Sequence, residues 1–199
     1  MTEQKLLMQL DDYLKAGIHI GTRFRTKFMS KFIYKIKPDG LSVLNVEQIN
    51  IRLILAANLL SQYEPKDILV VSRRENGWKP VKLFSKVTGI KNFTGRYPPG
   101  ILTNVQLEDF VETKLILVID PIPDKNVIKD AEKLSIPVMA LCDTNNEQTS
   151  IDLVIPCNNK GKKSLALILY VLAREYAKSK GIIKSDKDFK YTVDDFTSE

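Results

Sequence analysis

A cluster of basic residues without acidic neighbours is the first feature of this sequence that could do chemistry. Between Tyr13 and Pro38 there are seven lysines and arginines and no carboxylate, and Asp12 and Asp39 flank the stretch. Clustered cations need an external anion, and the interspersed aromatic rings could stack on bases or sugars. The segment 13–38 therefore predicts a nucleic-acid interface. Its expected contacts are Arg23, Arg25, Lys27, Lys31, Tyr34, Lys35 and Lys37.

A second set of basic and polar residues follows expected strands or opens expected helices, where α/β proteins gather functional groups. The run from Asn158 to Ser164 is similar to the end of a phosphate loop, but Lys162 replaces a required glycine and the first glycine is also missing. What remains is a helix start suited to RNA phosphates, or an ordinary solvated cap. The expected further contacts are Arg73, Arg74, Lys79, Arg96, Asn158, Asn159, Lys160, Lys162 and Lys163.

Two aspartates offer a catalytic alternative, because Asp120 and Asp143 each follow an expected strand and could hold magnesium. Both are better explained as turn residues that accept backbone hydrogen bonds. His19 has no evident orienting partner, and Cys142 and Cys157 lack close metal-ligand spacing. We expect no catalytic residue, no metal and no cofactor. A nucleotide-dependent enzyme and a module that binds an acidic protein remain the alternatives.

Composition limits the class of protein. The 199 residues suggest about one domain, and a net charge of +6 with a pI near 9.2 favours a polyanionic partner. The longest apolar run, Leu165 to Ala173, is far shorter than the roughly 18 residues of a membrane span. The N-terminus lacks a secretory pattern, and two cysteines are too few for a disulfide framework. We expect a cytoplasmic protein without a membrane or a small-molecule substrate as partner.

The spacing of apolar residues predicts the elements that position these groups. Strands are expected over 41–46, 67–72, 90–93, 114–119, 136–141 and 153–155, and helices over 2–16, 47–63, 79–88, 126–134 and 161–180. Continuous apolar strands between helices predict a three-layer α/β fold with a parallel sheet. Residues 1–183 are expected to form one domain and 184–199 a polar, flexible tail. Phe189, Tyr191 and Phe196 leave open that the tail docks on a partner.

Short motifs along the chain resemble those of one known family. They are Ala16-Gly17-Ile18-His19-Ile20-Gly21-Thr22, Pro38-Asp39-Gly40, Gly95-Arg96, Leu102-Thr103-Asn104, Ala140-Leu141-Cys142-Asp143-Thr144, Asp152-Leu153-Val154-Ile155-Pro156, Asn158-Asn159-Lys160-Gly161 and Leu172-Ala173-Arg174-Glu175. Together they closely resemble the small-subunit ribosomal protein S2 family in its archaeal and eukaryotic branch, with an archaeal pattern. The resemblance covers nearly everything from Tyr13 to Gly181.

The resemblance implies a flavodoxin-like (Rossmann-like) parallel sheet flanked by helices. It also implies a structural constituent of the small ribosomal subunit that binds small-subunit rRNA and neighbouring ribosomal proteins, including the S5 protein, and supports assembly and translation without catalysis. The coiled-coil insertion of the bacterial branch has no room here, since Leu41 to Val46 runs directly into the next helix. Arg73, Trp78 and Ile122-Pro123 depart from the family pattern.

Overall fold

Five parallel strands form the central sheet of the protein. The computed structural model describes residues 6–147 and 149–197, apart from the side chain at position 187. The strands stand in the order β4-β3-β5-β6-β7. They are β3 (Ile68–Ser72), β4 (Lys91–Thr94), β5 (Leu115–Val118), β6 (Val138–Cys142) and β7 (Leu153–Pro156). Every neighbouring pair is parallel, as the continuous apolar runs predict.

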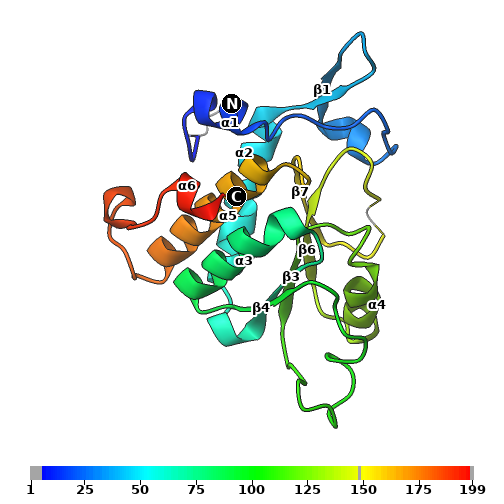
Figure 1. Ribbon diagram of the computed structural model, residues 1–199, viewed down its shortest axis with the longest axis vertical. Helices are drawn as coiled ribbons and strands as arrows, with labels where there is room; N and C mark the ends of the chain where they lie inside the picture. Colours follow the sequence, from blue (N-terminus) through cyan, green and yellow to red (C-terminus); the bar gives the residue numbers. More distant parts are fainter. Residues whose placement is uncertain (1–5, 148, 198–199) are drawn as a thin grey trace.

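Helices cover both faces of the sheet and complete three layers, which confirms the predicted flavodoxin-like class (Figure 1). On one side lie α2 (Val46–Ser61), α3 (Glu75–Thr88) and α5 (Lys162–Ser179), and on the other lies α4 (Lys125–Lys133). Strands β3, β5 and β6 are buried along their whole length between these layers. Among the described residues, no helix is both long and apolar enough to cross a bilayer.

A small hairpin stands apart from this sheet and carries part of the basic segment. Strand β1 (Ile33–Ile36) pairs antiparallel with β2 (Ser42–Leu44), and the hairpin projects at the top of Figure 1. The sequence predicted the second strand within 41–46 but not the first. Strand β1 mixes apolar residues with Tyr34 and Lys35 and is mostly exposed, so it has no continuous apolar run that signals a strand.

Helix α3 begins four residues before the predicted start at residue 79. Gly77 and Pro80 both lower helix propensity, which hides the first turn from sequence reasoning. The glycine is required by packing, because a Cβ at position 77 would lie 2.4 Å from the Ser72 hydroxyl oxygen. A close approach of helix to strand therefore overrides propensity at this point. Helices α2, α4 and α5 agree with prediction within a few residues at their ends. The helix predicted over 2–16 is wrong in its first part, because residues 6–9 are not helical and the helix begins at Leu10.

The first helix and three short 3-10 turns complete the body of the chain. Helix α1 (Leu10–Ala16) ends at Gly17, which adopts a φ of 68°. The 3-10 turns are η1 (Met29–Phe32), η2 (Pro65–Asp67) and η3 (Asp186–Asp188).

The polar tail lies against helix α5 and ends in the short helix α6 (Val193–Phe196). The Phe196 side chain is fully buried, and its ring lies 5.9 Å from that of Tyr170 on α5. Phe189 packs on the same tyrosine at 5.4 Å. Phe189 and Phe196, which the sequence offered as possible contacts to a partner, therefore pack on α5 of the same chain. The flexibility expected for residues 184–199 stays a prediction.

Candidate nucleic-acid interface

The predicted basic segment leaves α1, passes over the carboxyl ends of β6 and β7, and enters the β1–β2 hairpin. Its charged side chains all face outward. The exposed residues are Arg23, Arg25, Lys27, Lys31, Tyr34, Lys35 and Lys37. Phe24 is 81% exposed and Tyr34 is 70% exposed. The chain thus presents two bare aromatic rings among cations, which is a surface that can both neutralise phosphates and stack on bases.

The cations of this segment are not neutralised by carboxylates of the described chain. Among the described residues, no ion pair involves Arg23, Arg25, Lys27, Lys35 or Lys37. Lys31 Nζ lies over the Phe28 ring at 3.9 Å, a cation–π contact that leaves the charge uncompensated.

A groove of about 560 Å³ runs along the segment. It is lined by Arg25, Thr26, Lys27, Ser30, Ile33, Tyr34, Lys35 and Ile36. Three cations and an exposed aromatic ring therefore face one open depression, so a polyanion seated in it would meet charge and stacking surface together.

Two threonines fix the start of the segment to the sheet. Thr144 Oγ1, just beyond β6, accepts a hydrogen bond from the Thr22 amide at 2.9 Å and donates to the Phe24 carbonyl at 3.0 Å. Thr26 donates through Oγ1 to the Asn146 carbonyl at 2.9 Å, and its amide donates to the Thr144 carbonyl at 3.0 Å. These bonds hold the backbone between residues 22 and 26 while its arginines stay free.

Gly21 allows the same close approach. A Cβ at this position would lie 2.5 Å from the Thr144 side chain and 3.1 Å from the Ser42 carbonyl oxygen. The basic segment can therefore lie directly on the strand ends only because residue 21 has no side chain.

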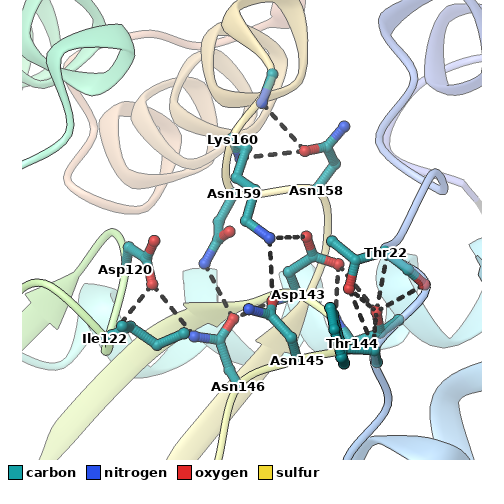
Figure 2. Close-up of polar contacts among 12 residues, drawn as sticks. Thr22, Asp120, Ile122, Asp143, Thr144, Asn145, Asn146, Asn158, Asn159 and Lys160 are labelled. Carbon is teal, nitrogen blue, oxygen red and sulfur yellow. Dashed lines mark hydrogen bonds and ion pairs between the residues drawn. The ribbon is translucent and has the colours of Figure 1, made fainter.

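The strand ends beneath the segment are filled by a network of polar side chains and ion pairs (Figure 2). Lys160 Nζ lies 3.0 Å from Asp143 Oδ2, and it also donates to Asn145 at 3.1 Å. Asp120 pairs with Arg74 and accepts a bond from Asn146 Nδ2 at 3.2 Å. The two aspartates are only 1% exposed. Buried carboxylates need a charge partner, and Arg74 and Lys160 supply it here. The catalytic alternative built on the two aspartates has no open carboxylate to use.

The second predicted group divides once its surroundings are known. Asn159 is fully buried and donates to the Leu141 carbonyl at 3.0 Å, so its side chain does not reach solvent. Asn158 Oδ1 accepts from the amides of Lys160 and Gly161, and Arg74 is occupied by its ion pair. These side chains build the site rather than face outward. The predicted contacts that remain exposed are Arg73, Lys79, Arg96, Lys162 and Lys163.

Sequence reasoning missed the anchoring role of Thr22, Thr26, Thr144 and Asn146. No local signal identifies them, because Thr22 and Thr144 are 122 residues apart in the chain. The sequence predicted that Asp143, Thr144 and Asn146 form a polar turn, and the turn exists, with the Asp143 amide donating to Asn146 Oδ1 at 2.7 Å. Its partners come from the opposite end of the chain.

His19, Cys142 and Cys157 do not add a reactive group to this surface. Burial, followed by the nearby charge of Lys37, lowers the pKa of His19, which favours the neutral imidazole. Burial raises the pKa of both cysteine thiols well above the usual value, so they stay protonated and inert. Within the described residues, no three side chains of the types His, Cys, Asp and Glu gather where they could hold a metal ion.

Fold and surface together define a class: a three-layer α/β protein whose strand-end aspartates Asp120 and Asp143 are held in internal ion pairs and whose basic segment exposes its cations. Comparison with known proteins narrows this class. Residues 107–179 match the family model for ribosomal protein S2. The chain belongs to the ribosomal protein S2 family.

Three archaeal relatives illustrate how far the similarity extends. The small ribosomal subunit protein uS2 of Nanoarchaeum equitans is 50% identical over 193 residues, which cover 97% of this chain and 96% of that protein. The uS2 proteins of Picrophilus torridus and Thermoplasma acidophilum are 47% and 46% identical, with coverage of at least 98% on both sides. The predicted family, its archaeal character and the absence of enzymatic function are confirmed by this membership.

Proposed function

We propose that this protein is a structural constituent of the small ribosomal subunit in the cytoplasm and that it binds small-subunit rRNA through the basic segment 13–38. The observation that carries this proposal is the set of exposed, unpaired cations beside exposed Phe24 and Tyr34 on a backbone anchored to the sheet. Phosphate contacts of this kind supply affinity and register without reading sequence.

Lys162 and Lys163 at the start of α5, with Lys79, extend the proposed contact to further rRNA phosphates. Neighbouring small-subunit proteins, including the S5 protein, are proposed partners for the remaining exposed surface, because the relatives are named as components of the small subunit. In this role the protein supports subunit assembly and translation.

Salt dependence tests the rRNA contact. The triple variant Arg23→Ala, Arg25→Ala, Lys27→Ala is expected to weaken binding to a small-subunit rRNA transcript, because three cations that neutralise phosphates disappear. The slope of log K against log salt should become shallower by roughly one unit for each phosphate that is no longer neutralised. Filter binding or fluorescence titration at salt concentrations from about 50 to 400 mM gives both the affinity and the slope.

The matched control removes the same charge elsewhere. Lys66, Lys125 and Lys129 are exposed and lie outside the proposed contacts, so their combined change to alanine should leave the slope unchanged. Equal slopes for the basic-segment variant and the wild type would refute the contact. Failure of the wild-type protein to co-sediment with small subunits at high magnesium would refute the ribosomal role itself.

A further inference from the structure

A second depression, separate from the basic segment, opens at the carboxyl ends of three neighbouring strands. It has a volume of about 240 Å³ and is lined by Arg73, Arg96, Tyr97, Pro123, Asp124 and Asn126. Arg73 follows β3, Arg96 follows β4 and the aspartate follows β5. Adjacent parallel strands end together here, which is the usual place for a ligand in an α/β sheet.

Asp124 has an unusual role in this pocket. It precedes the first residue of α4, where an aspartate side chain normally accepts a bond from the helix amides, yet it makes no such bond. Its Oδ2 instead accepts from the Arg73 backbone amide at 3.1 Å. Asp124 is only 2% exposed, and its Oδ1 is buried without a hydrogen-bond partner among the described residues. A buried carboxylate oxygen without a donor is costly, so the site favours a ligand that brings one.

The two arginines at the mouth of the pocket indicate an anion. Arg73 and Arg96 are exposed, and no ion pair in the described part of the chain engages either guanidinium. An anion alone would not satisfy Asp124, and a cation alone would not engage the arginines. The ligand must therefore carry a negative group and, close to it, a hydrogen-bond donor.

One nucleotide of RNA has this combination, since its 2′-hydroxyl lies beside its 3′-phosphate. We propose, as an extension of the rRNA-binding function, that this pocket holds a single ribonucleotide, with Arg73 and Arg96 on the phosphate and Asp124 Oδ1 accepting a hydrogen bond from the 2′-hydroxyl. The volume of about 240 Å³ is below the roughly 300–1,000 Å³ of pockets for whole drug-sized ligands and suits a sugar and phosphate. The 2′-hydroxyl is the group by which proteins distinguish RNA from DNA.

Nucleotide titration followed by NMR tests this site without the ribosome. Adenosine 3′-monophosphate is expected to shift the Arg73 amide resonance, because that amide bonds to Asp124. It should bind at least about tenfold tighter than 2′-deoxyadenosine 3′-monophosphate, the effect of one hydrogen bond to a charged group. Inorganic phosphate should bind more weakly than the ribonucleotide. Equal affinity for the two nucleotides, or phosphate as tight as the ribonucleotide, would overturn the proposal.

Two variants assign the roles. Asp124→Ala should bring the ribose-to-deoxyribose ratio close to one, and Arg96→Ala should weaken both nucleotides by a similar factor. Lys66→Ala, at an exposed position outside the proposed contacts, is the control and should leave mononucleotide binding unchanged. If Asp124→Ala does not fold, the comparison of nucleotides on the wild-type protein still decides. The salt slope of the basic-segment variant is independent of this titration, so the rRNA contact and the nucleotide pocket can fail separately.

Discussion

Single aspartates at the strand ends have very different surroundings. Asp143 is buried but lies 3.0 Å from the Lys160 ammonium, and Asp120 is buried against Arg74. Asp124 shares their burial, but its hydrogen bond comes from a backbone amide instead of a cationic side chain. Burial is the main cause that raises the pKa of Asp124 to about 6, and the Asp120 charge adds to the rise. The hydrogen bond from the Arg73 amide and the charges of Arg73 and Arg74 lower this pKa in turn.

The raised pKa of Asp124 predicts that the free energy of unfolding falls as the pH rises. Its folded pKa of about 6 lies above the ordinary 3.8, so between these values the folded protein keeps a proton that the unfolded chain has released. The contribution is complete below pH 3.8 and is lost through pH 6, up to about 3 kcal/mol. Asp124→Asn, which keeps an acceptor for the Arg73 amide, should therefore gain stability relative to the wild type between pH 4 and pH 7 in urea unfolding, a window that follows from the same pKa.

The exposed Asp109 provides the matched control, because Asp109→Asn removes the same charge from an open loop. Its stability difference from the wild type should change little over the same range. A difference for Asp124→Asn that stays constant with pH would contradict the assigned titration.

At the scale of elements, the loop from Gly21 to Thr26 depends on the end of β6 for its position. Thr144→Val keeps the shape of the side chain but leaves the Thr22 amide without its partner. The expected cost is about 1–3 kcal/mol of stability, measured by urea unfolding. Affinity for rRNA should fall because the cations are less well positioned, while the salt slope stays the same because every cation is still present.

Thr103 supplies the control for this prediction, since it is exposed and lies far along the chain from the basic segment. Thr103→Val should change neither stability nor rRNA affinity. A reduced salt slope for Thr144→Val would mean that the threonine affects the number of phosphate contacts and not only their placement.

The sequence predicted those elements whose burial is continuous. Strands β5 and β6 have only buried apolar residues, and α5 presents a long apolar face, so local pattern was sufficient. Strand β1 and the first turn of α3 were missed because tertiary contacts decide them: pairing with β2 in one case and the Gly77 approach to Ser72 in the other. Contacts between residues that are distant in the chain are not encoded in local secondary-structure propensity.

The candidate site was predictable in its charge but not in its connections. Clustered bases such as Arg23 and Lys27 can be recognised in one sequence, because long charged side chains are exposed wherever they lack partners. Asn159 could not be separated from them. Its side chain is buried against the end of β6, where it donates to the Leu141 carbonyl and to Asn146 Oδ1, and only the folded sheet brings these groups together.

At the scale of the whole molecule, α1 from the first part of the described chain and α6 from its last part both contact α5. Arg174 on this helix donates to the Leu7 carbonyl at 2.7 Å and lies 3.2 Å from Asp186 of the tail. A single buried arginine therefore contacts both the segment before α1 and the C-terminal tail. The helix that covers the sheet also holds these two segments in place.

Removing the Phe196 ring tests how firmly the tail is held. The side chain is fully buried against Tyr170, so Phe196→Ala should release α6 and make trypsin cleavage at Lys190 faster. The loss of packing at this position is on the order of 3–5 kcal/mol, but global stability falls by less if the tail opens locally. Timed proteolysis read by mass spectrometry measures the cleavage rate.

Asp194→Ala, on the exposed side of α6, is the corresponding control and should leave cleavage unchanged. An equal cleavage rate in wild type and Phe196→Ala would mean that the tail already detaches freely in the native protein.

The internal ion pairs at the strand ends also limit where a ligand can bind. A ligand placed between these side chains would first have to separate Arg74 from Asp120 and Lys160 from Asp143. Each pair therefore competes with a ligand for its own aspartate, which leaves Asp124 as the aspartate of this edge that a ligand can engage.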